Sequence, residues 1–403
     1  MVIAGTNSLR WHNSKVQVFS SDCRKLRVAK MAEVRPAQRS CRRQNCNISL
    51  GASSSNDDSV WKGLPDHLIE AVLKRLPLAP ICRFRAVCKG WNSLLTSYRF
   101  CQQLAGIPWI YVVIFQKENS GALYDPVERN WYRCIIPHLH GKDVRPLASA
   151  GSLICLYDTD NQRLCVANPL KNSVRPLPHP PCLRWPFVEV GMTLNGDNIS
   201  SGYKIVSLGT GGSYVIYDSL QNNWIHRGRL PSVCLPLSFV PGSKVVSIGC
   251  KVYFLRIKPD GLISYNMDND IWEQFFVQLP SNLSDYSLAE GEGKLLLLEA
   301  TSGRTCRLQV FELQNLRWRT VSCTPANFCG EFYKSNVLMQ CISNQKLIMV
   351  SLSSDILTRI YTYDVLERKW YRDILLPPGM ERTKGKQKIL LGAAFDSSLT
   401  ASA

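Results

Sequence analysis

The sequence predicts an all-β, six-bladed β-propeller preceded by a small domain of three short helices. The first observation behind this prediction is a turn motif that occurs six times between residues 124 and 370, with starts separated by 43 to 52 residues. A period of about 45 to 50 residues in a strand-rich chain is typical of propeller blades. The second is a run of apolar residues at helical spacing, bounded by prolines, upstream of the repeats. We therefore expect a disordered basic tail over residues 1–58, a helical domain over 59–105 and the propeller over 109–400.

The predicted tail is basic and poor in apolar residues. Residues 1–50 contain ten Lys or Arg and two Asp or Glu, so they supply +8 of the net charge of +17. Residues 51–59 are rich in Gly, Ser, Asn and Asp, a composition typical of flexible linkers. Most such tails are simply solvated, so we expect disorder and no nucleic-acid function for the chain as a whole. An organelle transit peptide is the alternative for this Arg- and Ser-rich start.

The helical domain begins at a proline-bounded helix. Its apolar residues share one face at helical spacing: Leu68, Ile69, Val72, Leu73 and Leu76. Pro65 suits the first turn of this helix, and Pro77 ends it because proline cannot continue the hydrogen-bond ladder. Pro80 opens a second short helix, and Gly90 separates it from a third. Three such helices enclose too small a core to be very stable alone, so we expect a partner to cover part of their apolar surface.

Two stretches of the helical domain resemble the F-box. They are Leu64-Pro65 with the helix that ends at Leu76-Pro77, and the run Arg85-x-Val87-Cys88-Lys89-x-Trp91-x-x-Leu94. The resemblance implies a module that docks on a Skp-type adaptor, and through it a cullin, in a Skp–cullin–F-box (SCF) ubiquitin ligase. The adaptor contacts that it implies are Leu64, Pro65, Leu68, Ile69, Leu73, Leu76, Pro77, Val87, Cys88 and Trp91. The alternative is a small helical capping subdomain whose apolar residues only pack on the next domain.

The six repeats share an aromatic residue, a polar turn residue and, six positions after the polar one, a Trp. The second copy departs from this pattern at Ala167 and Val174. The polar side chain turns the backbone, and the Trp starts the outer strand and covers the space between adjacent blades. The repeat anchors are Asp125, Trp131, Asn168, Asp218, Trp224, Asn266, Trp272, Glu312, Trp318, Asp364 and Trp370. These units resemble the kelch repeats of plant F-box/kelch proteins, although the kelch Gly-Gly doublet is degenerate, as at Gly151-Ser152.

The ends of the repeat region predict how the ring closes. Only two strand-sized runs precede Trp131, so the first blade lacks its inner strand. Residues 389–396 resemble residues 188–195, which form the predicted inner strand of the third blade. We therefore expect the C-terminal segment to complete the first blade and remove both sheet edges.

The sequence contains no arrangement typical of catalysis or metal binding. Its 16 cysteines include no Cys-x-x-Cys pair, and His138 and His140, the one close histidine pair of the propeller, fall in a loop. We expect free thiols in a reducing compartment, no metal, no cofactor and no enzymatic activity. A propeller enzyme is the alternative, and it would need a bound metal. No apolar run approaches the roughly 18 to 20 residues that span a bilayer, so we expect no membrane partner.

Two loops between an outer strand and the next inner strand carry residues typical of binding hot spots. We assign tentative substrate contacts to Arg184, Trp185, Phe328, Phe332 and Tyr333. The alternative is that these aromatic residues fold back over the tops of the blades. The resemblance implies a substrate-recognition subunit that binds an unknown protein, located in the nucleus, the cytoplasm or both. An F-box propeller could instead be a scaffold or transcriptional co-factor outside the ligase.

Overall fold

The computed structural model divides the chain into two compact units, Met1–Ser59 and Val60–Ala403. The first unit, which holds the predicted tail over 1–58, lies outside the described residues. Within the second unit the structure describes residues 64–76, 78–97, 99–101, 108–114, 120–139, 142–180, 188–196, 201–209, 211–231, 245–256, 260–280, 285–301, 306–333, 335–377 and 390–396. All structural statements below concern these residues.

Three short helices come first, as predicted: α2 (Asp66–Leu73), α3 (Leu78–Phe84) and α4 (Lys89–Leu95). Pro65 precedes α2 in an extended conformation, and its carbonyl accepts the first helical N–H groups, from Leu68 and Ile69. Cys88 caps α4, because its Sγ accepts the backbone N–H of Trp91 at 3.4 Å. The rings of Phe84 and Trp91 meet edge to face with centroids 5.3 Å apart, which joins α3 to α4.

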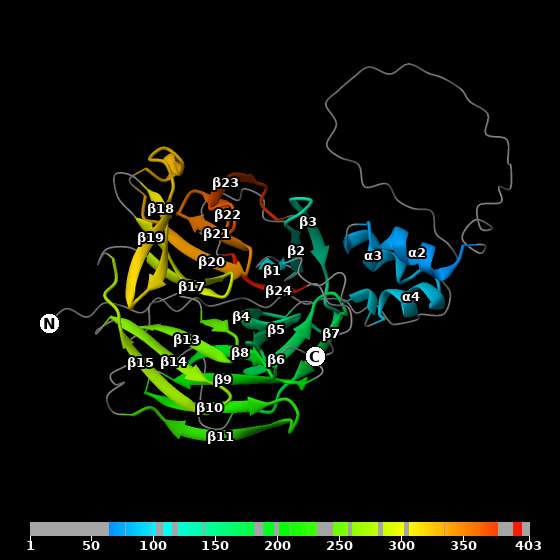
Figure 1. Ribbon diagram of the computed structural model, residues 1–403, viewed down its shortest axis with the longest axis horizontal. Coiled ribbons are helices and arrows are strands. Elements are labelled where there is room, and N and C mark those ends of the chain that lie inside the picture. The colour runs from blue at the N-terminus through cyan, green and yellow to red at the C-terminus, as the bar shows by residue number, and fades with distance from the viewer. Residues whose placement is uncertain are drawn as a thin grey trace, which may run out of the picture. The chain divides into compact units, whose positions relative to one another are not determined.

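Six sheets of four antiparallel strands follow, which confirms the six-bladed propeller (Figure 1). From the inner to the outer strand, the first three blades are β24 (Leu391–Asp396), β1 (Pro108–Ile114), β2 (Ser120–Asp125) and β3 (Asn130–Cys134); β4 (Val144–Ala150), β5 (Leu153–Asp158), β6 (Arg163–Asn168) and β7 (Ser173–Pro176); and β8 (Val188–Leu194), β9 (Tyr203–Gly209), β10 (Ser213–Asp218) and β11 (Asn223–Arg229). The other three are β12 (Val246–Ile248), β13 (Lys251–Arg256), β14 (Gly261–Asn266) and β15 (Ile271–Phe276); β16 (Asp285–Gly291), β17 (Lys294–Thr301), β18 (Arg307–Gln314) and β19 (Arg317–Cys323); and β20 (Leu338–Asn344), β21 (Leu347–Ser353), β22 (Thr358–Asp364) and β23 (Lys369–Ile374).

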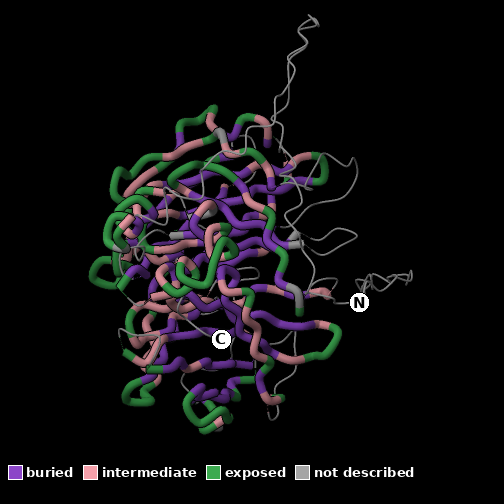
Figure 2. The backbone as a smooth tube through the Cα atoms, turned by 90° about the vertical axis from the view of Figure 1, so that its right-hand side faces the viewer, coloured by how far each residue is buried: buried purple, intermediate pink, exposed green. Residues whose placement is uncertain are grey.

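The core lies between the blades. Inner and middle strands are covered on both faces by neighbouring blades, so β5 is buried along its whole length. Outer strands such as β19 are largely exposed. Figure 2 shows the same division, with buried segments inside the ring and exposed segments in the turns. This explains why second strands such as β5 and β21 are nearly continuous apolar stretches rather than alternating ones.

The repeated turn joins the third strand of a blade to the fourth. In five blades it has four residues, and the last one has a positive φ: Arg129, Asn172, Asn222, Asp270 and Arg368. The Asp or Asn that starts the turn accepts a backbone N–H from within it, as predicted. Asp125 Oδ1, for example, lies 2.8 Å from the N–H of Val127.

Glu312 departs from this pattern and does not start a turn. Strand β18 continues two residues beyond it, and the hairpin to β19 consists of Asn315 and Leu316 alone, both with positive φ. Two such residues are typical of a type I′ hairpin, which is shorter than the turn of the other blades. The Glu312 carboxylate instead lies 3.2 Å from the ammonium group of Lys294 on the neighbouring strand.

The repeated Trp residues bridge adjacent blades. The indole N–H of Trp131 donates to the carbonyl of Leu375 at 2.7 Å, just after β23 of the sixth blade. The indole of Trp224 donates in the same way to Pro178, at 2.9 Å, just after β7 of the second blade. Trp272 packs against Tyr214 of the third blade, with ring centroids 5.0 Å apart. Each of these three Trp residues therefore contacts the preceding blade.

The first blade receives its inner strand from the C-terminal segment. Strand β24 pairs with β1 in antiparallel register, from Pro108 opposite Asp396 to Val113 opposite Leu391. The backbone N–H of Asp396 also donates to the carbonyl of Gly151 in the second blade, at 2.8 Å. The first and last described strands of the propeller thus share one sheet, which leaves no open edge between the first and sixth blades.

Candidate functional site

Helix α2 carries two apolar stripes side by side. Ile69 and Leu73 are 6% and 1% exposed, and they lie in the same core cluster as residues of α3 and α4. Leu68 and Val72 are 43% and 44% exposed. Because residues four positions apart share a helix face, Leu68 and Val72 form an apolar stripe next to the buried one. We call these two residues the exposed stripe.

The predicted adaptor contacts that the structure describes fall into three groups by exposure. Pro65, Leu68, Val87 and Cys88 are exposed, whereas Ile69 and Leu73 belong to the interior of the domain. The partly buried members pack against that interior: Leu64, Leu76 and Trp91. Pro77 lies outside the described residues. In this conformation the buried residues support the surface rather than form it.

Sequence reasoning left Val72 out of the contact set, although its spacing from Leu68 was the signal that could have included it. Val87, at 60% exposed, is a further large apolar side chain that the helices leave open to solvent. The helical domain therefore presents the exposed stripe and Val87 as uncovered apolar groups.

The helical domain also contacts the second blade. Arg85 donates from Nη1 to the carbonyl of Leu170, in the turn between β6 and β7, at 3.1 Å. Leu170 is 7% exposed, whereas its counterparts Val127, Leu220 and Leu366 in other turns are 62% to 73% exposed. The contact therefore covers one of these turns. Arg85 belongs to the F-box-like motif, but nothing in the sequence indicated this role.

Cysteine burial is extensive in the described chain. Burial raises the pKa of the Cys82 thiol, on α3, to about 11, and that of Cys134, at the end of β3, to about 12. These two thiols are protonated at neutral pH, so they act as small apolar groups. All cysteines that the structure describes are free thiols.

The predicted substrate contacts are only partly at the surface. Arg184 and Trp185 lie outside the described residues. Phe332 is fully buried, so its assignment as a surface contact is wrong. Phe328 is partly buried, and its ring packs on Tyr361 with centroids 5.5 Å apart. Tyr333, at 58% exposed, is the most exposed of the described members of the set.

The loop that carries Tyr333 is held against the sixth blade. Glu331, within the short 3₁₀ helix Gly330–Phe332, accepts a hydrogen bond from Tyr361 Oη at 3.3 Å. Its carboxylate also lies 2.9 Å from Arg372 and 3.5 Å from Arg359. These contacts and the buried Phe332 hold the loop against the sixth blade. The position of Tyr333 relative to that blade is therefore fixed.

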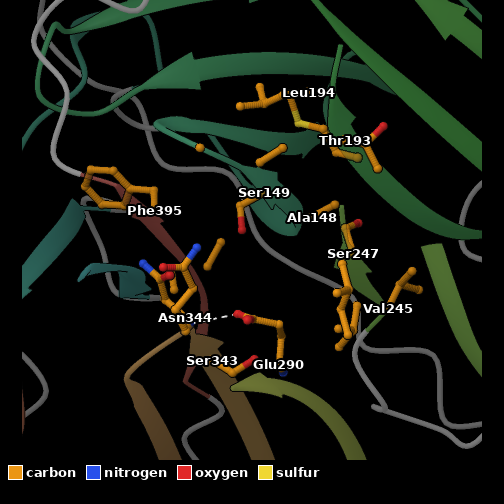
Figure 3. Close-up of a pocket in the computed structure, with 18 of the residues that line it drawn as sticks. Ala148, Ser149, Thr193, Leu194, Val245, Ser247, Glu290, Ser343, Asn344 and Phe395 are labelled. Atoms are coloured by element: carbon orange, nitrogen blue, oxygen red, sulfur yellow. Dashed lines mark hydrogen bonds between the residues drawn. The ribbon is translucent and has the colours of Figure 1, made fainter. Parts of the chain in front are cut away.

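A cavity of about 650 Å³ lies at the centre of the ring (Figure 3). Its wall consists mainly of residues from the inner strands of all six blades and from hairpins that follow several of them, with Asp268 from the turn between β14 and β15. Glu290 of β16 is tied into this wall through both carboxylate oxygens. One accepts the backbone N–H of Gly293 at 2.9 Å and the other that of Gln345, in the sixth blade, at 2.8 Å. Sequence reasoning did not find this cavity.

The described residues contain no group of three or more His, Cys, Asp or Glu side chains that could hold a metal ion. Among the described helices, none is long and apolar enough to cross a membrane. Among the described residues, three candidate surfaces stand out: the exposed stripe with Val87, the loop of Tyr333 and the central cavity.

Comparison with known proteins identifies the helical domain and the whole chain. The family model for the F-box domain matches residues 61–103. F-box only protein 6 of Arabidopsis thaliana is 37% identical over 395 residues, which cover 93% of this chain and 84% of that protein. Protein UNUSUAL FLORAL ORGANS of the same plant is 24% identical over 394 residues, 85% of this chain and 86% of that protein. An F-box/kelch-repeat protein, also from Arabidopsis thaliana, is 24% identical over 328 residues, 75% and 79% of the two chains. The chain, with an F-box ahead of a six-bladed propeller, belongs to the plant-type F-box proteins.

Proposed function

We propose that this protein is the substrate-recognition subunit of an SCF ubiquitin ligase. In this proposal the F-box domain, residues 59–105, docks on a Skp-type adaptor that links it to a cullin. The propeller, residues 109–400, binds the protein to be ubiquitinated. The observation that carries the proposal is the set of uncovered apolar side chains on the F-box domain, the exposed stripe and Val87.

The exposed stripe lies outside the apolar core of the F-box domain. Leu68 and Val72 contribute little to the core, which Ile69 and Leu73 already fill. Burying a Leu or Val side chain against a partner is worth about 1.5 to 3 kcal/mol, so this stripe could supply a large part of a docking energy. Uncovered aliphatic groups on a domain with a small core are typical of a surface that a partner covers.

F-box proteins generally act as adaptors without catalysing a reaction themselves, and this chain fits that role. Its contribution is to hold a target close to a ubiquitin-charged enzyme that the cullin recruits. Proximity alone raises the effective concentration of the target and so accelerates transfer. We place this action in the nucleus or the cytoplasm, where such ligase components would meet the chain.

Replacing Leu68 by Asp tests the docking surface. The carboxylate would lie near the N-terminus of α2, where the helix dipole favours negative charge, so the helix should persist. Affinity for a purified Skp-type adaptor, measured by surface plasmon resonance, should fall by at least about tenfold. This factor corresponds to losing the free energy that the burial of one Leu side chain contributes to binding. Leu220→Asp is the matched control, because Leu220 is 68% exposed in a propeller turn. Equal adaptor affinity of the two variants would refute the docking assignment.

A comparison of wild type with Leu68→Asp in cells distinguishes a ligase subunit from a scaffold that acts outside the ligase. Proximity labelling in plant cells with ligase turnover blocked should recover the same neighbours for wild type and Leu68→Asp. Without the block, a neighbour that is a substrate should be more abundant in cells with Leu68→Asp. If every neighbour were equally abundant in cells with wild type and in cells with Leu68→Asp, the scaffold hypothesis would be favoured.

A further inference from the structure

The wall of the central cavity carries carboxylates without a basic partner. Asp268, Glu290 and Asp396 line it, and the described wall residues include no Lys, Arg or His. This contrasts with the whole chain, in which 48 Lys and Arg outnumber 31 Asp and Glu. The cavity is therefore an acidic site inside a basic protein.

Asp396 and Glu290 face this space from different blades. Glu290 has its two backbone N–H donors, whereas Asp396 receives a single long hydrogen bond, from Asn344 Nδ2 at 3.5 Å. Burial raises the pKa of both groups, and repulsion from Asp396 adds to the rise for Glu290. Two partly buried carboxylates that repel each other would be stabilised by a cation between them.

The wall also contains an unpaired hydroxyl group. Thr193, on β8, is 2% exposed, and its Oγ1 has no hydrogen-bond partner among the described residues. Buried polar groups are normally hydrogen-bonded, so this hydroxyl group can bond to a ligand or to a water molecule. Ser149, Ser247 and Ser343 add hydroxyl groups from three other blades (Figure 3).

These groups match the chemistry of a basic side chain. A guanidinium or ammonium group offers only N–H donors, and carboxylate and hydroxyl oxygens are acceptors for them. The apolar part of the wall, including Ala148, Val245 and Phe395, suits the methylene stem of Arg or Lys. An anionic ligand would meet like charge at Asp396 and Glu290, which is repulsive at short range.

We propose that the central cavity of the propeller binds the guanidinium or ammonium group of an Arg or Lys side chain presented by the bound protein, with Asp396 as its main acceptor. This inference rests on the proposed function, because it identifies which part of a target the receptor holds. Glu290 provides the second negative charge and Thr193 a further acceptor. The recognised segment is then a flexible stretch of the target that places one basic residue in the ring.

The test uses two short peptides and the full-length chain. The peptide acetyl-Ala-Arg-Ala-amide is compared with its citrulline counterpart, which has the same shape and no charge, by isothermal titration calorimetry. We expect the Arg peptide to bind at least about tenfold more tightly than the citrulline peptide. The interaction free energy that corresponds to this ratio lies between those typical of exposed and of buried charge pairs. Asp396→Asn should abolish this preference. Asp355→Asn should keep it, because Asp355 lies in an exposed turn outside the cavity wall.

Three results would overturn the inference: equal binding of the two peptides, no binding of either, or an unchanged preference in Asp396→Asn. Agmatine, a free guanidinium compound, distinguishes the source of the group. Binding of agmatine without binding of the Arg peptide would indicate a small-molecule ligand and reject a peptide side chain. Adaptor affinity of the same preparations is measured in parallel. Loss of adaptor binding with a retained Arg preference would reject the ligase role alone.

Discussion

Replacing Gly392 by Ala should loosen the closure of the ring. Gly392 lies opposite Val112 in the pairing of β24 with β1, and it also lines the central cavity. A Cβ at this position would lie 2.5 Å from the carbonyl oxygen of Tyr111 and 2.5 Å from Cδ1 of Ile342. The Ile342 side chain can rotate away, but the carbonyl belongs to the backbone of the neighbouring strand. Close C···O contacts between strands are about 3.3 Å long, so the two strands must separate by about 0.8 Å.

The cost of this separation can be estimated from other overpacked cores. Inserting one methyl group into a filled site costs about 1 to 3 kcal/mol, and the rigid carbonyl puts this site toward the upper value. Each kcal/mol lowers the melting temperature of a large domain by about 2 to 4 °C. We therefore expect Gly392→Ala to melt about 4 to 12 °C below wild type in differential scanning calorimetry.

The control for this prediction is Gly211→Ala. A Cβ at Gly211 has no heavy atom within 4 Å, and its backbone is not in the left-handed region. This variant should melt within about 1 °C of wild type, as expected for a surface substitution without contacts. If Gly392→Ala melted together with Gly211→Ala, the close packing of β24 on β1 would be refuted.

Three further predictions concern the F-box core, the blade contacts and the cavity. Leu73→Ala should destabilise the F-box domain by about 2 to 5 kcal/mol, seen as faster amide hydrogen exchange in α2, while the amides of the fourth blade keep their protection. Trp131→Phe should cost about 0.5 to 1.5 kcal/mol in chemical denaturation, because it removes the hydrogen bond from the indole to the carbonyl of the exposed Leu375. Trp272→Phe should cost less, because that indole N–H has no partner among the described residues. Asp396→Asn should raise the melting temperature at neutral pH by an amount that shrinks on acidification. Burial raises the Asp396 pKa, so stability from this group is present below its ordinary pKa and is lost as pH rises through the raised value; a pH-independent difference would contradict this.

The fold could be predicted from the sequence because each blade repeats the same chemistry. In most copies an Asp or Asn accepts a backbone N–H in the turn, and a Trp six positions later packs against the preceding blade. The constant spacing of these two residues therefore predicts a blade. Glu312 shows the limit of this reasoning, because it keeps the spacing while the chain around it forms a shorter hairpin. Which residues of a turn take a positive φ depends on the strands that it joins, and an aligned motif does not contain that information.

The candidate sites were harder to predict, for two physical reasons. On α2, Leu68 and Ile69 are adjacent in the sequence and equally apolar, but they project about 100° apart around the helix. Only the packing of the neighbouring helices decides which of them is buried. In the cavity, Glu290 and Asp396 come from the fifth and first blades, and they meet because β24 returns to the start of the ring. No local pattern can indicate such a pair.

The structure explains why the second blade departs from the repeat. In five blades a Trp packs at the gap to the preceding blade, but in the second blade Val174 stands there, and Ala167 replaces the aromatic residue. Both belong to, or pack against, the apolar cluster that also contains Leu73 of the F-box domain. An indole and a phenol ring at these positions would occupy the space that this shared cluster fills.

The irregular blade is therefore the one adapted to contact the F-box domain. Arg85 reinforces the contact through its hydrogen bond to the Leu170 carbonyl, in the turn that follows Ala167. In the proposed ligase this matters for transfer, because a receptor held to its docking domain by packing presents the target within a narrower volume than one on a free linker. A narrower volume means a higher effective concentration of the target at the ubiquitin-charged enzyme, provided that the geometry permits both to meet. The blade without the repeated Trp is thus the one whose apolar residues pack together with those of the F-box domain.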